Sequence, residues 1–458
     1  MELVKKFGAK KDVDMTEGSI VKHLVSFAFP LLIGNLFQQL YNTVDTWVVG
    51  NYVSNEAFSA VGSVTPIINL LIGFFMGLST GASVVISQYY GAKKLDKVQD
   101  TVHTAITVTL ILGVVFTAVG IGMVPFMLRL MKTPPEVVPE AATYLVIYFA
   151  GIMGLMVYNI GSGILRAIGD STRPFYFLVV SALTNIVLDL VFVLVFGMGV
   201  EGVAYATIIS QTLSAILVLI VMMRSDTCIK LDLRRLKIHG DMLLKIVKIG
   251  IPAALQMAIT SFSNVFVQSY MNYFGADAMS GWTAYTKIDH FLLLPMQSLA
   301  LAVTTFVGQN LGVGQDKRAR KGANTALGIA LFISITISVP IVIFAPYLVA
   351  FFNSKPEVVA YGTTLIHFIT PIHAVSCINQ IYSGALRGAG NSRAPMIVML
   401  LSFVLFRQIY LYTMSNFISN TFVPIAMGYP AGWTVCSILM FIYYKHTKLS
   451  DTRVVEEK

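Results

Sequence analysis

Long apolar runs recur along the whole sequence, and they restrict its fold more than any other feature. Each run holds roughly 20 or more residues, the length that an α-helix needs to cross the hydrocarbon core of a bilayer. In hydrocarbon every peptide group needs an internal hydrogen-bond partner, so a spanning chain forms helices or a closed barrel. The runs are continuous rather than alternating, which excludes a barrel. We therefore predict an all-α polytopic membrane protein.

The composition agrees with a membrane protein and argues against a nucleic-acid partner. Hydrophobic residues make up 56% of the chain and charged residues only 12%, about half the usual soluble fraction. The net charge is +9, but the basic residues form short clusters between apolar runs, as membrane topology requires. The three cysteines are far apart, so we expect no disulfide and no structural metal site. The polar N-terminus does not resemble a cleaved secretory signal.

We expect twelve spans, and the basic residues orient them. Of the 32 Lys and Arg residues, 27 fall in segments on the side of the N-terminus, and only Arg129, Lys132 and Lys355 fall in loops on the opposite side. Cytoplasmic loops carry the excess of positive charge, so both termini are predicted to be cytoplasmic. The expected spans are 20–49, 56–90, 98–124, 137–160, 172–196, 201–223, 243–273, 278–311, 322–349, 358–383, 394–417 and 422–444.

The sequence also repeats itself. The segments "GSGILRAIGDSTRP" (161–174) and "YSGALRGAGNSRAP" (382–395) agree at seven of fourteen positions, 221 residues apart. Pro30 and Pro252 match at an offset of 222. Two pseudo-symmetric six-helix lobes are therefore predicted, related by an axis along the membrane normal. The expected parts are a cytoplasmic tail (1–19), an N-lobe (20–223), a cytoplasmic linker (224–241), a C-lobe (242–446) and a second cytoplasmic tail (447–458).

No motif for enzymatic chemistry is present. The sequence has no Walker A loop, so ATP is not expected as the energy source. It also has no nucleophile elbow, zinc motif or dinucleotide-binding loop. We expect a protein that is not an enzyme and that has no cofactor.

Several of these features together resemble the multidrug and toxic compound extrusion (MATE) family. They are the repeated "SG-LR--G-S--P" loop, "YNTVDTWVVG" in the first span, "TNIVLD" in the fifth and "GQNLG" after the eighth. The resemblance covers essentially the whole chain. It implies two lobes forming a V around a central cleft, with alternating access. It also implies export of small amphipathic, mostly cationic compounds in exchange for H⁺ or Na⁺, from the bacterial inner membrane.

Within that family the chain resembles the branch typified by the DNA-damage-inducible F protein. This branch binds its coupling ion in the N-lobe, and the matching positions here are Asp45, Asn185, Asp189 and Thr207. Another branch uses acidic residues on the seventh and tenth helices. Here the seventh span has no Asp or Glu, and the tenth has His367 and His373 but no acid, which puts that kind of coupling in doubt.

The physical reading of these residues supports an ion site. Asn185 and Asp189 are four residues apart, so they share one helix face, and an intramembrane carboxylate is a functional residue by default. Asp45 lies fifteen residues after Pro30 and Asp189 fifteen after Pro174, so both sit roughly 22 Å above their prolines at 1.5 Å per residue. Two carboxylates in one apolar pocket do not both ionise cheaply, so the pair can hold a proton. Alternatively, its oxygens could bind Na⁺ with Asn185 and Thr207.

Two further groups of residues have open interpretations. Pro30 and Gly34 are either a static kink in the first helix or a hinge that bends when Asp45 changes charge. Lys287, Asp289 and Arg407 form a charged cluster in the C-lobe. It is either a structural ion pair or a charged wall that shapes substrate choice, and its two cations would not favour a cationic substrate on that side.

One rival function stays open alongside the exporter. A flippase for lipid-linked precursors, from a related superfamily branch, would need a large cationic cleft for an anionic headgroup, which Lys287 and Arg407 could supply. Against it, such flippases often carry extra spans. The expected partners are small organic molecules and the lipid bilayer, and we expect a monomer.

Overall fold

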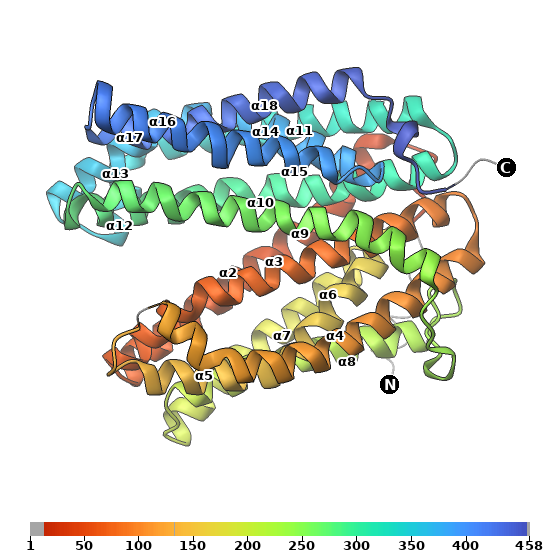
Figure 1. Cartoon of the computed structure of the whole chain (residues 1–458), viewed down its shortest axis with the longest axis horizontal. Coiled ribbons are helices and arrows are strands. Elements are labelled where there is room, and N and C mark those ends of the chain that lie inside the picture. The colour runs from red at the N-terminus through yellow and green to blue at the C-terminus, as the bar shows by residue number, and fades with distance from the viewer. Residues whose placement is uncertain (1–12, 132, 456–458) are drawn as a thin grey trace. The chain divides into compact units, whose positions relative to one another are not determined.

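The computed structural model describes residues 13–131 and 133–455, and within them every regular element is a helix (Figure 1). The predicted all-α membrane fold is confirmed. Residues 1–12 and 456–458 of the predicted tails, and Lys132 of a predicted outer loop, lie outside the described residues.

Eleven helical segments of the described chain are long and apolar enough to cross a bilayer, and one bent pair supplies a further crossing. The bent pair is α5 (Val138–Ala150) and α6 (Ile152–Ala167), which turn by 48°. Twelve crossings, as predicted, result when this pair counts as one. The first six single segments are α2 (Ile20–Tyr52), α3 (Asn55–Gly91), α4 (Leu95–Leu130), α7 (Thr172–Leu190) with η1 (Val191–Val195), α8 (Val200–Met223) and α9 (Gly240–Asn272).

The remaining segments follow α9, and several are built from more than one helical piece. A short 3₁₀ turn divides the tenth crossing at Pro371, since proline cannot donate the backbone hydrogen bond that would continue the helix. The segments are α10 (Ala276–Gly312), α11 (Asp316–Ile343), α13 (Pro356–Ile369) with η3 (Thr370–Ile372) and α14 (His373–Gly388), α15 (Arg393–Met399) with η4 (Leu400–Phe406), α16 (Arg407–Thr413) and η5 (Met414–Ile418), and α17 (Phe422–Ala426) with α18 (Gly428–His446). The short helices outside them are η2 (Leu233–Arg235), α12 (Ala345–Phe352) and η6 (Leu449–Thr452).

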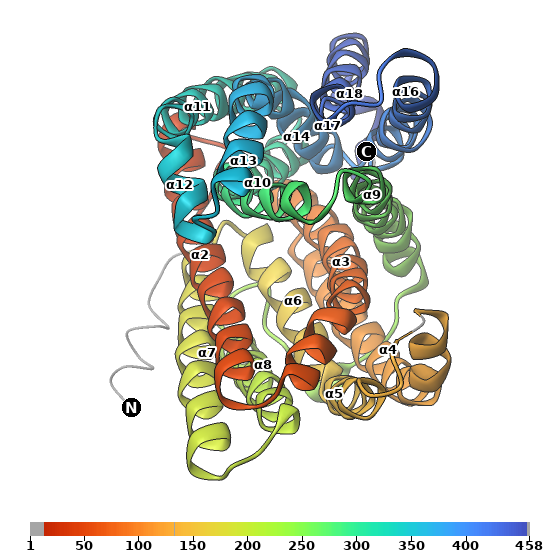
Figure 2. The same cartoon turned by 90° about the vertical axis from the view of Figure 1, so that its left-hand side faces the viewer.

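The chain divides into two compact units. Unit 1 contains residues 1–14 and 29–250, and unit 2 contains residues 15–28 and 251–458. The division therefore falls inside α2 and inside α9. In unit 1, α6 packs against α3, α4 and α8; in unit 2, α10 packs against α11, α13 and α14 (Figure 2).

The N-terminal part of α9 belongs to unit 1 because it packs tightly on α3. A Cβ atom on Gly81 would lie 2.4 Å from the carbonyl oxygen of Ile246 and 2.8 Å from Cα of Gly250. Only glycine allows two helix backbones to approach this closely. Lys245 also donates a 2.7 Å hydrogen bond to the hydroxyl of Tyr89 on α3.

The repeated loop adopts the same local structure in both units. Gly169 and Gly390, at the same position of the repeat, have φ values of +88° and +94°, which glycine adopts without strain. A distant segment of the chain covers each loop: a Cβ atom on Gly169 would lie 2.3 Å from the carbonyl oxygen of Val13, and one on Gly390 would lie 2.5 Å from that of Thr452, the last residue of η6. The sequence repeat is therefore also a repeat of local structure.

Candidate functional site

The four residues predicted to bind the coupling ion are all buried within unit 1, and we call them the ion site. Asp45 comes from α2, Asn185 and Asp189 from α7, and Thr207 from α8. Their exposed fractions are 7%, 0%, 0% and 5%. The residues that the sequence places at a similar depth thus all turn toward the interior of one helix unit.

The side chains of the ion site interact with one another. The Asp45 carboxyl group lies within interaction range of Asp189 and Asn185. Among the described residues, Asp45 Oδ1, both Asp189 oxygens and both polar atoms of the Asn185 amide have no hydrogen-bond partner. Two carboxylates are both acceptors, so they hydrogen-bond one another only when one of them carries a proton. The unmet bonding capacity of these atoms fits a site that takes up a cation.

Packing between α7 and α8 holds the two α7 residues in place. Ser181 on α7 donates a 2.8 Å hydrogen bond to the carbonyl oxygen of Ser210 on α8. Thr207 donates to its own helix, to the carbonyl oxygen of Val203 at 3.0 Å, which leaves its oxygen free to accept. The α-helix also changes to a π-helical turn at Val191, two residues after Asp189; such turns often occur at functional sites.

Tyr144 on α5 is a residue of this site that sequence reasoning missed. It is 5% exposed, its hydroxyl lies within interaction range of the Thr207 side chain, and it lies within electrostatic range of Asp45 and Asp189. A tyrosine in an apolar span is usually a packing residue, so the sequence offered little signal. Its one clue is Tyr148, four residues later and stacked on it with ring centres 6.3 Å apart.

Tyr41 extends the polar surroundings of Asp45 along α2. It lies one turn before Asp45, is 8% exposed, and its hydroxyl interacts with Gln38 and with Gln211 of α8. Because α5 and α8 contribute Tyr144 and Gln211, four helices of unit 1 meet around the two carboxyl groups. The tyrosine hydroxyls are donors that can bond a carboxylate in either protonation state.

Pro30 and Gly34 lie within the continuous helix α2. A Cβ atom on Gly34 would lie 3.2 Å from the end of the Leu178 side chain on α7, so this glycine brings α2 close to the helix that carries Asn185 and Asp189. The hinge role of the two residues stays a prediction.

The structure separates the three charged residues grouped in the C-lobe. Lys287 is exposed, whereas Asp289, two residues later, is buried; side chains at i and i+2 of a helix do not share a face. No ion pair joins Asp289 to Arg407 within the described residues, and Asp289 instead lies 3.4 Å from His373. Arg407 donates hydrogen bonds of 3.1 Å to Ser263 and to Asn264.

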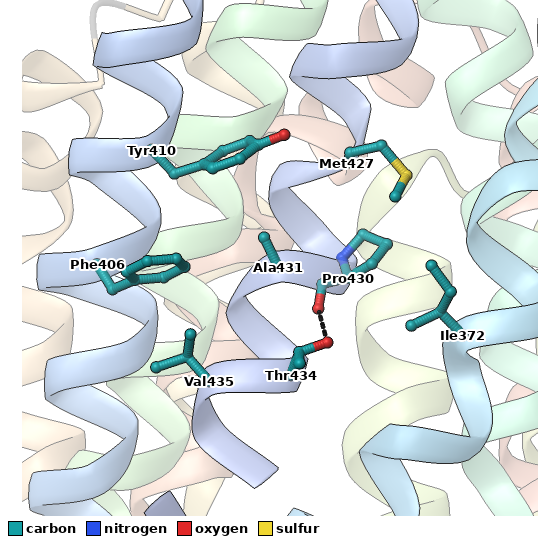
Figure 3. Close-up of a pocket in the computed structure, with 8 residues that line it drawn as sticks. All are labelled: Ile372, Phe406, Tyr410, Met427, Pro430, Ala431, Thr434 and Val435. Carbon is teal, nitrogen blue, oxygen red and sulfur yellow. Dashed lines mark hydrogen bonds between the residues drawn. The ribbon is translucent and has the colours of Figure 1, made fainter. Parts of the chain in front are cut away.

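Unit 2 also holds an apolar pocket of about 310 Å³ (Figure 3). Aromatic side chains from η4 and α16 face one side of α18 across it. The only lining hydroxyls bond locally, Thr434 to the carbonyl oxygen of Pro430 and Tyr410 to that of Pro424. Its lining residues are Ile372, Phe406, Tyr410, Met427, Pro430, Ala431, Thr434 and Val435. None of them is ionisable near neutral pH, so this pocket offers no ion-coupling chemistry.

Comparison with known proteins gives one consistent result. The family model MatE matches twice, over residues 30–191 and 252–413, which agrees with the internal repeat. "Probable multidrug resistance protein YpnP" of Bacillus subtilis is 30% identical over 98% of this chain and all of its own length. "Probable multidrug resistance protein NorM" of Thermotoga maritima is 27% identical over 84% of this chain and 83% of its own.

A solved structure described as the outward-facing conformation of a multidrug resistance MATE family transporter has the same fold. It superposes with a TM-score of 0.91, covers 97% of this chain and 99% of its own, and is 24% identical.

Proposed function

The chain belongs to the MatE family, and we propose that it is a secondary active exporter. In this proposal, small amphipathic organic compounds leave the cell in exchange for H⁺ or Na⁺. The coupling rests on one observation: two buried carboxyl groups from α2 and α7 interact in unit 1 and have oxygen atoms without hydrogen-bond partners among the described residues. The names of the multidrug relatives support the exporter over the flippase.

For a proton, the pair itself supplies the chemistry. With both carboxylates ionised, two like charges share an apolar pocket, which is costly. One proton placed between Asp45 and Asp189 turns one acceptor into a donor, lets the two groups bond, and halves the charge. The hydroxyl of Tyr144 lies within interaction range of Thr207 and of both carboxyl groups.

For Na⁺, the same residues offer oxygen ligands. Carboxylate, amide and hydroxyl oxygens are the ligands that hard cations prefer, and Asp45, Asp189, Asn185 and Thr207 carry one or more each. Here the ion's positive charge, rather than a proton, offsets the two carboxylates. Both ions therefore produce the same change, a reduction of negative charge in the interior of unit 1.

The proposed cycle uses that change in charge. An external cation binds at the ion site, α2 rearranges, and the substrate is released outward. Release of the cation to the cytoplasm resets the protein. The proposed location is the bacterial inner membrane, with both termini cytoplasmic and the protein working as a monomer.

Reconstituted vesicles test the proposal. Efflux of a fluorescent amphipathic compound is measured under an imposed pH gradient, an imposed Na⁺ gradient, both or neither. The proposal predicts that at least one gradient accelerates efflux several-fold and that an ionophore collapsing that gradient abolishes the acceleration. An efflux rate that neither gradient changes, together with movement of labelled lipid-linked precursors across the membrane, would favour the flippase instead.

A further inference from the structure

A second pair of buried ionisable groups lies in unit 2. Asp289 of α10 and His373, the first residue of α14, are 8% and 0% exposed. Their Oδ1 and Nε2 atoms are 3.4 Å apart, longer than the 2.7–2.9 Å typical of a charge-assisted hydrogen bond. Among the described residues, neither ring nitrogen of His373 nor Oδ1 of Asp289 has a hydrogen-bond partner. The two groups thus lie close together with their bonding capacity unmet.

The surroundings of this pair are aromatic and low in charge. On α10, Tyr285 lies one turn before Asp289 and its hydroxyl interacts with the carboxyl group. From α18, the Trp433 ring meets the His373 ring edge-on at 5.2 Å, and Tyr429 lies within electrostatic range of Asp289.

Arg407 of α16 is a buried cation in the same unit. Its guanidinium lies 4.7 Å from the centre of the Tyr429 ring. The other charged residues and histidines of the packed helices lie elsewhere. Lys287 and His290 of α10, Glu357 and His367 of α13, and Lys445 and His446 of α18 are exposed, and the charged residues of α11 fall within its first six positions. Asp277 of α10 pairs with Lys355, and Arg387 of α14 donates hydrogen bonds to Gln256 and Ser383. Cys377 and Cys436 are buried thiols on α14 and α18.

We propose that Asp289 and His373 form a second proton-binding site, located in unit 2 and separate from the ion site. A proton taken from water joins the imidazole Nε2, and the pair changes from a net charge of −1 to zero. The proton then closes a bond between the two groups, which satisfies atoms that otherwise lack partners. An isolated buried charge is costly, so the pair with zero net charge is more stable in the apolar interior than the pair that carries −1. Because a proton occupies almost no volume, the site needs no cavity to bind it.

Proton uptake here also changes the charge balance of unit 2. Before uptake, the buried side chains of unit 2 include the carboxylate of Asp289 and the guanidinium of Arg407. After uptake, the negative charge of Asp289 is offset by the proton, while Arg407 keeps its positive charge and its neutral partners Ser263 and Asn264. The site therefore gives unit 2 a pH-dependent interior charge, whichever ion occupies the ion site of unit 1.

Trp433 provides a direct readout, because a protonated imidazole in contact with an indole ring lowers its fluorescence. The purified full-length protein is titrated from pH 8.5 to 4.5 without substrate, and the emission of a Trp433→Phe variant is subtracted to remove Trp47 and Trp282. The proposal predicts one reversible fall in the Trp433 signal as the pH is lowered. His373→Gln should abolish this fall. Asp289→Asn should weaken proton binding by about tenfold or more, because the carboxylate favours the imidazolium.

Two controls separate this site from other causes. His367 is an exposed histidine of α13, and His367→Gln should leave the transition unchanged. The double variant Asp45→Asn with Asp189→Asn should also leave it unchanged. This second control distinguishes a failure of the ion site from a failure of this site. Variants that elute as the wild type and melt at a similar temperature are compared. A pH-independent Trp433 signal, or a transition that persists in His373→Gln, would overturn the proposal. Should His373→Gln not fold, an unchanged transition in Asp289→Asn would overturn it equally.

Discussion

At the scale of single residues, the ion site combines two features that are each costly alone. Asp45 and Asp189 are carboxyl groups inside an apolar helix unit, and their oxygens lack hydrogen-bond partners among the described residues. Neither feature improves stability. A site that must bind and release a cation in every cycle needs such unmet capacity, because a fully bonded network would hold neither a proton nor Na⁺ reversibly.

Tyr144 gives the first prediction at this scale. Tyr144→Phe removes the hydroxyl that interacts with Thr207 and keeps the ring that packs on Tyr148. One neutral hydrogen bond contributes on the order of 1 kcal/mol, so we expect the apparent affinity for the coupling ion to fall about fivefold. This apparent affinity is measured from the dependence of the efflux rate on the concentration of the coupling ion. Tyr205→Phe, an exposed tyrosine of α8, is the matched control, and an equal effect of both changes would contradict the role of Tyr144.

The two units do not duplicate the ion site. At an offset of 221 or 222 residues, Asp45, Asn185 and Asp189 correspond to residues 266–267, 406–407 and 410–411. These positions hold Phe and Val, Phe and Arg, and Tyr and Leu, so none is acidic. The helices and the loops at 161–174 and 382–395 are similar in the two units, while the buried polar residues differ.

At the scale of elements, two prolines mark the places where helices pass between the units. Helix α2 passes from unit 2 to unit 1 after Ala28, next to Pro30, and α9 passes from unit 1 to unit 2 after Gly250, next to Pro252. Proline lacks the N–H that would bond the preceding turn. Each of these helices is therefore weakest where it leaves one packed unit for the other.

This placement makes the hinge hypothesis testable. Pro30→Ala and Pro252→Ala restore a backbone hydrogen bond and should stiffen α2 and α9. We expect each to slow ion-driven efflux severalfold without lowering the melting temperature. Pro125→Ala is the control, because Pro125 is an exposed proline inside α4, within unit 1. If Pro30→Ala and Pro252→Ala both keep the wild-type rate of ion-driven efflux, the hinge hypothesis is wrong and the prolines are static kinks.

At the scale of the whole molecule, the sequence predicted most of the fold because bilayer thickness and backbone hydrogen bonding leave few alternatives. The twelve crossings followed from apolar length. The bend between α5 and α6 and the π-helical turns that follow Leu190 and Met399 did not, because contacts between helices determine them. Pro371 explains the break in the tenth crossing, but the sequence did not predict it, since a proline such as Pro30 also lies within a continuous helix. At the ion site, spacing and depth brought Asp45 and Asp189 together. Tyr144 was not predicted, and His373 was named on the tenth span without a role, because such residues usually serve packing.

The predicted topology makes a separate prediction at this scale. Two single-cysteine probes are placed in a Cys228→Ser background. Ser354→Cys marks the loop before α13, Lys237→Cys marks the segment before α9, and both positions are exposed. The remaining cysteines, Cys377 and Cys436, are buried. With cytoplasmic termini, a membrane-impermeant maleimide added to intact spheroplasts should label Ser354→Cys only. Lys237→Cys should react after the membrane is opened. The reverse pattern would invert the orientation.

Ion-driven transport by the acid variants tests the central claim most directly. Asp45→Asn and Asp189→Asn each remove one carboxylate of the pair while keeping its size. Glu201→Gln, at an exposed position of α8, is the matched control. We predict that in vesicles each aspartate variant loses at least 90% of gradient-driven efflux, roughly 1.4 kcal/mol or more of coupling, whereas Glu201→Gln keeps the wild-type rate. Wild-type gradient-driven efflux by both aspartate variants would show that the ion is coupled elsewhere.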